Sequence, residues 1–310
     1  MVKTKLLIIG YSSFVRRRVL PSLKKNKQIN YYICSKSQKI NPKKKILFND
    51  YNRALSQVSP NIVYISLINS LHFNYAKLIL KKGFNVIVDK PIASSLKKTK
   101  ELLKIAKKKN LLLSEATLFN YHKVFYKMIN LCKGTRNIIH IQSNFHVPGT
   151  NFINLKKFSR IKGDCEDDMA PYAASIIRLF TNNKLKELNV SKEYIKGSRY
   201  VKSFYVGVAL KDCLYLGSFS RQKQYTSQVS FFTKDKIITS PQKAFALPAN
   251  KNLHKTIKEK NKINKIKIKK DDCIKNFFEQ ILYSLKSKNF KIFYKKLIYD
   301  AILREKIKNG

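Results

Sequence analysis

Tryptophan is absent from this 310-residue sequence, and glycine is scarce, with nine residues. Acids are also few, because 18 Asp and Glu stand against 64 Lys and Arg, which leaves a formal net charge of +46. Five cysteines form no Cys-x-x-Cys pair, which argues against a disulfide framework and a cysteine-rich zinc site. No uncharged apolar run approaches the roughly 18 residues of a membrane helix. We therefore expect a soluble, cytoplasmic protein without membrane partners.

The excess of positive charge predicts a surface that attracts phosphates and nucleic acids. The lysines are spread over the whole chain, without the aromatic or Gly-Arg pattern typical of a platform for single strands. Lys, Asn, Ile, Phe and Tyr are abundant together, and AT-rich codons favour all five. We attribute most of the charge to that bias on solvated faces and expect no specific nucleic-acid partner.

The first part of the chain alternates short apolar runs with longer amphipathic stretches, which is typical of a parallel sheet with helical crossovers. The length suits two domains. The predicted strands are 5–10, 31–35, 61–68, 85–90 and 110–115. The predicted helices are 13–26, 70–83 and 95–110. Residues 1–118 are therefore expected to form an α/β Rossmann domain with a doubly wound parallel sheet.

The pattern changes near residue 119, where runs of strand length follow one another between short polar turns. The predicted strands are 137–145, 203–210, 213–220, 227–234 and 265–270. The predicted helices are 119–133, 167–180, 272–286 and 291–308. We expect residues 119–310 to form an α+β domain with a largely antiparallel sheet for substrate binding and oligomerisation. The last helices could pack back on the first domain.

The loop after the first strand is a weak match to a dinucleotide fingerprint, which would place glycines at 10, 12 and 15. This loop contains Gly10, Ser12, Ser13, Phe14 and Val15, so only the first glycine is present. Ser12 is small and offers a hydroxyl, whereas Val15 adds bulk where close packing is needed. Taken alone, the loop leaves a nucleotide site and a plain strand-to-helix turn equally open.

The second strand ends in Ser35 and Lys36 rather than in an acid that would hold a ribose 2′-hydroxyl. Lys36 would suit a 2′-phosphate, which favours NADP over NAD as the cofactor. The alternative is that Lys36 is one of many surface lysines and sits there by composition.

Three later loops carry short motifs: Asn69-Ser-Leu-His72, Asp89-Lys90-Pro91 and Glu115-Ala-Thr-Leu-Phe-Asn120-Tyr121-His122-Lys123. They resemble the Asn-x-x-His, Glu-Lys-Pro and Glu-Ala-x-x-x-Arg-x-His-Pro motifs of the Gfo/Idh/MocA oxidoreductases, the family of glucose-fructose oxidoreductase and inositol dehydrogenase. Asp89, Asn120 and Lys123 depart from the usual Glu, Arg and Pro.

A fourth motif lies in an acidic stretch, which runs from Gly163 to Tyr172 and reads GDCEDDMAPY. It resembles the family's Gly-Gly-Gly-x-x-Asp-x-Gly-x-His or Tyr and keeps one of the first three glycines. Because proline is tolerated in the first helical turn, Pro171 predicts a helix start near 168–171 and places Asp168 and Tyr172 about one turn apart.

The other acids of this stretch have a structural interpretation. Glu166 and Asp167 are interpreted as acids that stabilise the helix start. No histidine lies nearby in the sequence, so we expect no metal site.

The resemblance implies a set of site residues. Lys90 would exchange a proton with the carbinol oxygen, with Asp168 or Tyr172 as its proton partner. The residues implied for substrate binding are Lys90, Tyr121, His122, Asp168 and Tyr172. The residues implied for cofactor binding are Gly10, Ser12, Ser13, Phe14, Ser35, Lys36, Ser66, Leu67, Asn69, His72, Asp89 and Lys90.

The resulting hypothesis is an NADP-preferring, or NAD-dependent, oxidoreductase that interconverts a hydroxyl and a ketone on a sugar. A nucleotide-linked sugar is attractive because a cationic surface would draw in its diphosphate, and free sugars stay open. The family resemblance implies a homo-oligomer, dimer or tetramer, with strands between 204 and 233 as the interface. The alternatives are a catalytically lapsed binding or structural subunit and a charge-driven nucleic-acid binder.

Overall fold

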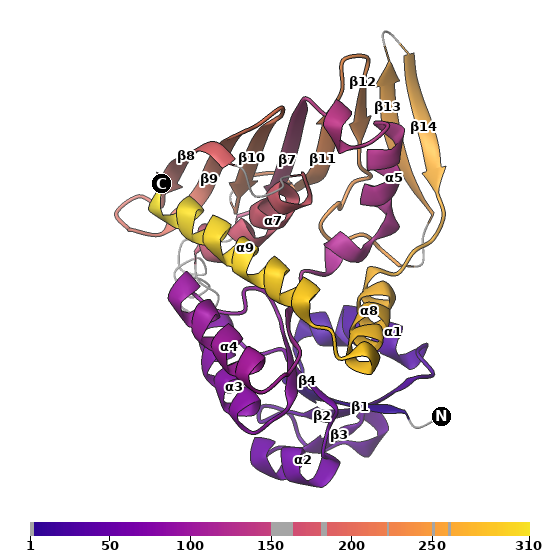
Figure 1. The fold of residues 1–310 in the computed structure, drawn as a ribbon, viewed down its shortest axis with the longest axis vertical. Helices are drawn as coiled ribbons and strands as arrows, with labels where there is room; N and C mark the ends of the chain where they lie inside the picture. The colour runs from indigo at the N-terminus through magenta and orange to yellow at the C-terminus, as the bar shows by residue number, and fades with distance from the viewer. Residues whose placement is uncertain (1–2, 150–163, 181–184, 222, 250–251, 260–261) are drawn as a thin grey trace. The chain divides into compact units, whose positions relative to one another are not determined.

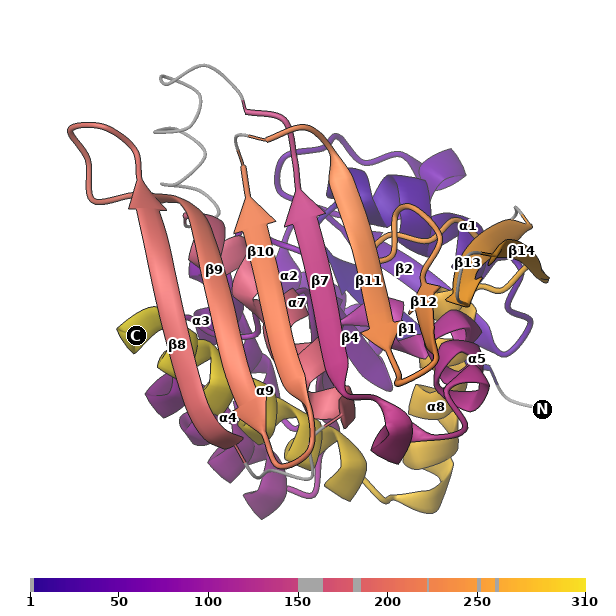
Figure 2. The same ribbon diagram turned by 90° about the horizontal axis from the view of Figure 1, so that it is seen from above.

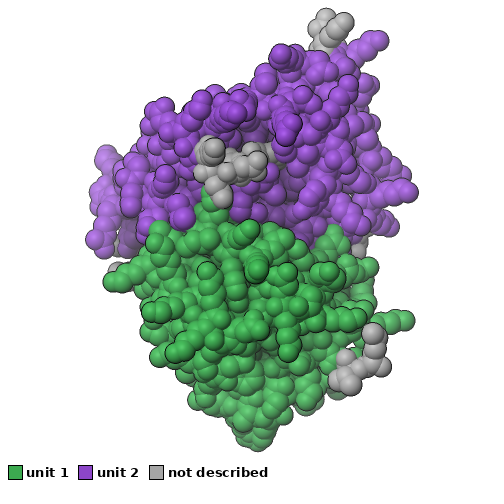
Figure 3. Space-filling model, in the orientation of Figure 1, with its two compact units in different colours: residues 1–116, 274–301 green, residues 117–273, 302–310 purple. Residues whose placement is uncertain are grey.

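The computed structural model describes residues 3–149, 164–180, 185–221, 223–249, 252–259 and 262–310. The chain forms two compact units (Figure 3). Unit 1 takes in residues 1–116 and 274–301, and unit 2 takes in residues 117–273 and 302–310. Unit 1 therefore combines the N-terminal part of the chain with a segment near the C-terminus.

Unit 1 is built on a six-stranded parallel sheet with the order β3-β2-β1-β4-β5-β6, the strand order of a Rossmann fold (Figure 1). Its strands are β1 (Thr4–Ile9), β2 (Ile29–Cys34), β3 (Ile46–Phe48), β4 (Ile62–Ile65), β5 (Asn85–Val88) and β6 (Leu113–Glu115). The prediction of a doubly wound parallel sheet is confirmed.

Helices in unit 1 alternate with the strands. They are the π-helical turn η1 (Val15–Val19), α1 (Leu20–Lys24), η2 (Pro42–Lys44), α2 (Tyr51–Val58), α3 (Asn69–Lys81), α4 (Leu96–Lys108) and α8 (Cys273–Ser287). Successive side chains of β1 and β4 point to opposite faces of the sheet, each covered by helices. Leu7 and Val63 pack in a core with α2, α3 and α4, whereas Tyr64, the next residue on β4, contacts Phe278 of α8.

Unit 2 contains an eight-stranded sheet with the order β14-β13-β12-β11-β7-β10-β9-β8 (Figure 2). Its strands are β7 (His140–His146), β8 (Leu185–Tyr194), β9 (Val201–Leu210), β10 (Leu214–Ser220), β11 (Thr226–Phe232), β12 (Lys236–Thr239), β13 (Leu253–Glu259) and β14 (Lys262–Ile268). Neighbouring strands are antiparallel except for β7 and β10. The prediction of a largely antiparallel sheet is confirmed.

The helical segments of unit 2 are η3 (Leu118–Tyr121), α5 (Lys123–Leu131), η4 (Thr135–Asn137) and α7 (Cys165–Phe180). Helix α7 packs against β9 and β10 and covers one face of the sheet. The last helix, α9 (Lys291–Asn309), begins in unit 1 and ends in unit 2. In the part of the chain that the structure describes, no helix is long and apolar enough to cross a membrane.

The predicted start of the helix around Pro171 is wrong. Helix α7 begins at Cys165, so Pro171 lies inside it. The earlier start is stabilised by Asp164, whose carboxylate accepts a hydrogen bond from the N–H of Asp167 at 3.2 Å. Asp168 and Tyr172 are still four residues apart on one helix, as the sequence indicated.

Candidate functional site

The candidate site of unit 1 lies at the carboxyl edge of its parallel sheet, in the residues that directly follow the strands. Their backbone N–H groups continue the sheet: Gly10 donates to Cys34, Ser66 donates to Ile9, and Asp89 donates to Ile65, each at 2.8 to 2.9 Å. These loops therefore start from fixed positions along the carboxyl edge, where doubly wound folds bind their ligands.

Gly10 is required by its surroundings. Its φ is +100°, and a Cβ built on it would lie 2.2 Å from the carbonyl oxygen of Ser66. A side chain would therefore strain the backbone and collide with the neighbouring loop.

Ser12 takes the place of the fingerprint's second glycine. Its hydroxyl oxygen lies 2.8 Å from that of Ser66 and accepts the N–H of Val15 at 3.1 Å. The side chain is thus turned toward the protein and leaves the outer side of the loop open. Ser13 and Phe14, the next two predicted cofactor residues, are exposed.

Asp89 is at the centre of a hydrogen-bond network. One carboxylate oxygen accepts the hydroxyl of Tyr64 and the other accepts the hydroxyl of Ser66. Burial raises the pKa of Asp89, while these hydrogen bonds and the nearby charges of His72 and Lys90 act in the opposite direction. Ser66 and Asp89, both predicted to bind the cofactor, therefore bond to each other and link the loop of Ser12 to the residue before Lys90.

Lys90 is half-buried at the carboxyl end of β5. The Lys90–Pro91 peptide bond is cis. Two residues after Lys90, the N–H of Ile92 donates to a carboxylate oxygen of Glu115 at 2.7 Å. Glu115 of the Glu-Ala motif therefore supports the loop that carries Lys90.

Two further predicted cofactor residues follow β2. Ser35 is buried, with its hydroxyl 3.4 Å from that of Ser37. Lys36 is exposed, and its Nζ lies over the ring of Tyr51, 4.9 Å from the ring centroid. The cation is held at the end of β2, where a ribose 2′-substituent lies in this type of fold.

The remaining predicted cofactor residues follow β4. Leu67 and Asn69 are partly exposed, whereas His72 is fully buried. Both ring nitrogens of His72 lie within hydrogen-bond distance of backbone oxygens. His72 therefore has no nitrogen available for a cofactor.

Unit 2 carries the predicted proton partners. Asp168 forms an ion pair with the buried Arg221, with 2.8 Å between carboxylate oxygen and guanidinium nitrogen. Tyr172, one turn further along α7, lies in an aromatic cluster with Phe119, Phe145 and Phe245 at centroid distances of 4.9 to 5.6 Å. The two candidates therefore have different surroundings, one charged and one apolar.

The other acids near the start of α7 each have an identified hydrogen-bond or ion-pair partner. Glu166 lies 3.1 Å from the Nζ of Lys192, and Asp167 receives a hydrogen bond from Lys308. Asp164 is the residue that caps the helix. Glu166 and Asp167 lie in the first turn of α7, as the sequence interpretation required, and both also form ion pairs. Gly163 lies outside the described residues.

His122 and Tyr121, both predicted to bind substrate, lie at the start of α5. The Nδ1 of His122 accepts the N–H of Val124 at 3.1 Å and caps the helix, and burial lowers the pKa of this side chain. The Nε2 of His122 has no hydrogen-bond partner among the described residues. Tyr121 is partly exposed.

The structure thus brings the predicted residues together as two groups, one in each unit. In unit 1 these are the loop residues around Gly10, Ser66 and Lys90, and in unit 2 they are Asp168 and Tyr172. No three His, Cys, Asp or Glu side chains are grouped to hold a metal ion in the described part of the chain.

Sequence reasoning missed Tyr64 and Arg221, which bind the two central carboxylates. A signal for Tyr64 existed, because it is the one polar-tipped side chain in an otherwise aliphatic strand, IVYI. A phenol buried in such a strand needs a hydrogen-bond partner. Arg221 directly follows a strand, but nothing in the sequence connects it to Asp168.

Comparison with known proteins finds a family match in the N-terminal part of the chain. Residues 4–117 match the model of the GFO_IDH_MocA oxidoreductase family, described as an NAD-binding Rossmann fold. The N-terminal part of the chain is thus similar to the Rossmann domain of the Gfo/Idh/MocA family. The family resemblance seen in the sequence motifs is thereby confirmed.

The chain spans about two fifths of the length of the two curated relatives that it matches. D-xylose 1-dehydrogenase (NADP(+)) 2 of Haloferax volcanii is 26% identical over 137 residues, which cover 43% of this chain and 42% of the relative. dTDP-3,4-didehydro-2,6-dideoxy-alpha-D-glucose 3-reductase of Streptomyces violaceoruber is 22% identical over 138 residues, which cover 44% and 40%.

Similarity of fold to solved structures extends over nearly the whole chain. The 3-ketoreductase KijD10 of Actinomadura kijaniata, solved in complex with NADP and TDP-benzene, has a TM-score of 0.90 and 17% identity, and the match covers 99% of this chain and 98% of that one. A dehydrogenase (MviM) of Clostridium difficile has a TM-score of 0.80 and 18% identity. At this identity the likeness concerns the fold.

Proposed function

We propose that this protein is an oxidoreductase that uses NADP in preference to NAD and moves a hydride between the nicotinamide and a sugar carbinol or ketone. The observation that carries the proposal is the place of Lys90, next to the Tyr64–Asp89–Ser66 network at the carboxyl edge of a Rossmann sheet. A positioned cation at that edge can exchange a proton with the oxygen of a carbinol whose carbon lies beside the cofactor.

The residues of the first loop fit a dinucleotide. Because the hydroxyl of Ser12 is used inside the protein, the outer side of the loop is open for a diphosphate. The start of the helical segment that follows attracts such an anion through the dipole of the helix, although the N–H of Val15 is already bound by Ser12. Lys36, stacked on Tyr51, is placed to bind a 2′-phosphate, which supports the preference for NADP.

The chemistry then divides between the cofactor and the chain. When bound, the nicotinamide supplies or accepts the hydride. Lys90 donates to the substrate oxygen or accepts its proton. Lys90 and Tyr172 form the proposed proton-exchanging pair, with Asp168, which is paired with Arg221, as the alternative to Tyr172. Solved structures of KijD10 include variants at one lysine and one tyrosine, which are the residue types of this pair.

A nucleotide-linked sugar is the proposed substrate. KijD10 is solved with TDP-benzene, and one curated relative is named as a reductase of a dTDP-linked sugar. The net charge of +46 also favours a substrate with a diphosphate. A free sugar is the alternative, supported by the relative that is named as a D-xylose dehydrogenase.

The decisive experiment is a titration of the protein into NADPH and NADH, following nicotinamide emission at low and high salt. The chain has no tryptophan, so the protein background is small. We expect saturable binding that survives high salt and is tighter for NADPH. Turnover of nucleotide-sugars is then compared in Lys90→Ala, which should lose it, and in Lys97→Ala, an exposed lysine of α4, which should keep it. Binding that never saturates would instead favour a non-catalytic member of the family.

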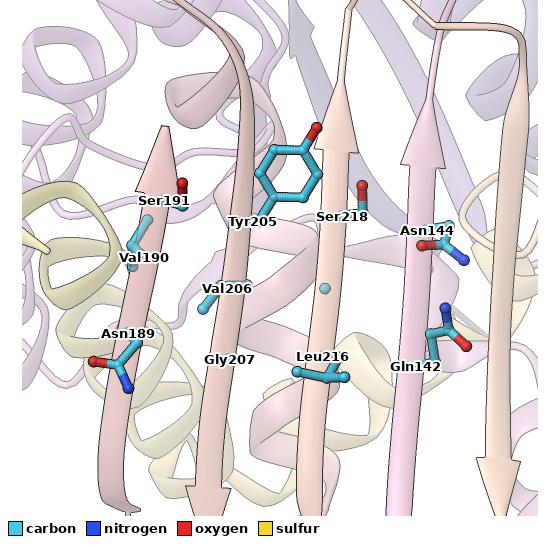
Figure 4. Close-up of a pocket in the computed structure, with 11 residues that line it drawn as sticks. Gln142, Asn144, Asn189, Val190, Ser191, Tyr205, Val206, Gly207, Leu216 and Ser218 are labelled. Atoms are coloured by element: carbon cyan, nitrogen blue, oxygen red, sulfur yellow. The ribbon is translucent and has the colours of Figure 1, made fainter. Parts of the chain in front are cut away.

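The open face of the unit 2 sheet is proposed as the contact between copies of the chain. Strands β7, β10 and β11 contain no charged residue, although the chain has 64 Lys and Arg. Leu214 and Leu216 of β10 are exposed there by 41% and 42%. A hollow of about 430 Å³ on this face is lined by residues that include Gln142, Tyr205 and Leu216, which Figure 4 labels.

A second copy of the chain is the occupant that this face fits, since an uncharged surface avoids the repulsion between two strongly cationic molecules. We expect a dimer or tetramer in sedimentation velocity, and a monomer for Leu216→Lys. The matched control is Leu78→Lys on α3, where Leu78 is exposed by 43%. A monomeric wild-type protein, or an unchanged Leu216→Lys assembly, would contradict this contact.

A further inference from the structure

His72 has an arrangement of partners that fixes its protonation state. The side chain is fully buried in the first turn of α3. Its Nδ1 lies 2.8 Å from the carbonyl oxygen of Pro91, and its Nε2 lies 3.1 Å from the carbonyl oxygen of Leu67. Carbonyl oxygens only accept hydrogen bonds, and a neutral imidazole has one N–H. Both bonds can therefore form only when both nitrogens carry a proton.

A buried imidazolium needs a counter-charge. Asp89 is the nearby acid, because the charges of His72 and Lys90 both act to lower its pKa, although burial has the larger effect and raises that pKa. Two other titratable side chains lie around Asp89 and His72. Tyr64 of β4 donates to Asp89, and Glu115 of β6 accepts the N–H of Ile92. The hydroxyls of Tyr64 and Ser66 keep this carboxyl group in place.

The two carbonyls belong to different loops. Leu67 lies in the loop after β4, one residue from Ser66, and Pro91 directly follows Lys90 after β5. We propose that His72 is a positioning residue, a buried imidazolium that ties the Leu67 loop to the loop of Lys90 and so fixes Lys90 relative to the cofactor edge. Loss of one proton removes one of the two hydrogen bonds and frees one loop. The effect on catalysis rests on the proposed function, whereas the charge state of His72 does not.

The first test is independent of activity. The full chain, labelled with ¹⁵N in its histidines, is examined by NMR from pH 6 to 8.5. The signals of His72 are assigned as those missing in His72→Gln. We expect both ring nitrogens of His72 to carry protons that exchange slowly with water. A neutral ring with one N–H at pH 6 would overturn the proposal.

The second test separates positioning from folding. His72→Phe removes both donors, whereas the amide of His72→Gln can donate to the carbonyls at any pH. We expect His72→Phe to lower kcat about 100-fold, as expected for a misplaced catalytic group, with little change in KM for NADPH. In His72→Gln we expect partial rescue of kcat.

The control is His254→Gln, an exposed histidine of β13, which should match the wild type. Thermal unfolding of each variant checks that it is folded. A folded His72→Phe variant with wild-type kcat would contradict the positioning role. If the wild-type protein binds no nicotinamide nucleotide, the proposed function fails. The NMR result still decides whether both ring nitrogens of His72 carry protons and link the two loops.

Discussion

The two units satisfy their central carboxylates in opposite ways. In unit 1, Asp89 accepts two neutral hydroxyls, from Tyr64 and Ser66. In unit 2, Asp168 is matched with a guanidinium, that of Arg221. Hydroxyls can point toward a charge or be relayed through one another, as Ser12 and Ser66 are, whereas an ion pair requires its one partner. A single substitution should therefore have a larger effect on stability in the second arrangement than in the first.

Gly10→Ala should give the largest effect on stability, because it strains the backbone of unit 1 and does not act through the Asp89 carboxylate. The new Cβ would meet the carbonyl of Ser66 at a positive φ. We expect a loss of about 3 kcal/mol in the free energy of unfolding together with loss of nicotinamide binding. Urea denaturation measures the first, and Gly134→Ala, at a positive φ with open space around it, is the control. Equal losses in both variants would show that backbone strain alone decides the effect.

Arg221→Met should be the next largest, since it leaves Asp168 without its guanidinium. Removing one partner of a buried pair costs about 3 to 5 kcal/mol, and we expect about 2 to 3 kcal/mol because Asp168 is partly exposed. Adding Asp168→Asn should restore part of the loss. If the double variant is no more stable than Arg221→Met, the ion pair is not the cause.

Tyr64→Phe tests the hydroxyl arrangement of unit 1, because phenylalanine keeps the ring of tyrosine and lacks only its hydroxyl. Asp89 keeps its bond from Ser66, so we expect a loss of only about 1 to 2 kcal/mol. The measurement is again urea denaturation. A loss as large as that of Arg221→Met would remove the contrast between the two units.

The smallest effect concerns pH. Burial raises the pKa of Asp164 and of Glu166 in the folded chain. These groups bind protons more readily when folded, so they add stability as the pH falls from neutral and lose that contribution as the pH rises through the raised pKa. The stability of the wild type relative to the Asp164→Asn, Glu166→Gln double variant should therefore increase between pH 7 and pH 5. A constant difference would argue that neither carboxyl titrates in that range.

Much of the fold could be predicted from the sequence, because buried parallel strands are apolar runs that periodicity detects. Strands β3, β8, β12 and β13 and helix α2 were missed. Strand β3 has three residues and follows a lysine-rich segment, so its apolar signal is too short to recognise. The start of α7 was placed too late because the rule for proline describes the helix alone, whereas Asp164 and Lys308 stabilise the turns before Pro171.

The candidate site could be predicted where it depends on residues next to strand ends. Gly10, Ser66 and Lys90 follow this rule, and the motif residues around them were named from the sequence. The partners that set the chemistry, such as Tyr64 for Asp89 and Arg221 for Asp168, come from other strands. Sequence spacing holds no information on such pairs. The roles of the predicted site residues stay predictions until the binding and turnover experiments are made.

The contact proposed across the uncharged strands β7, β10 and β11 would give salt two opposite effects on this molecule. Two copies that meet across β7, β10 and β11 bring together surfaces without charge, while the rest of each molecule repels the other. Salt screens that repulsion beyond about 10 Å at 0.1 M and should promote self-association. The same salt weakens attraction to phosphates, so ionic strength should shift the protein from contacts with polyanions to contacts with itself.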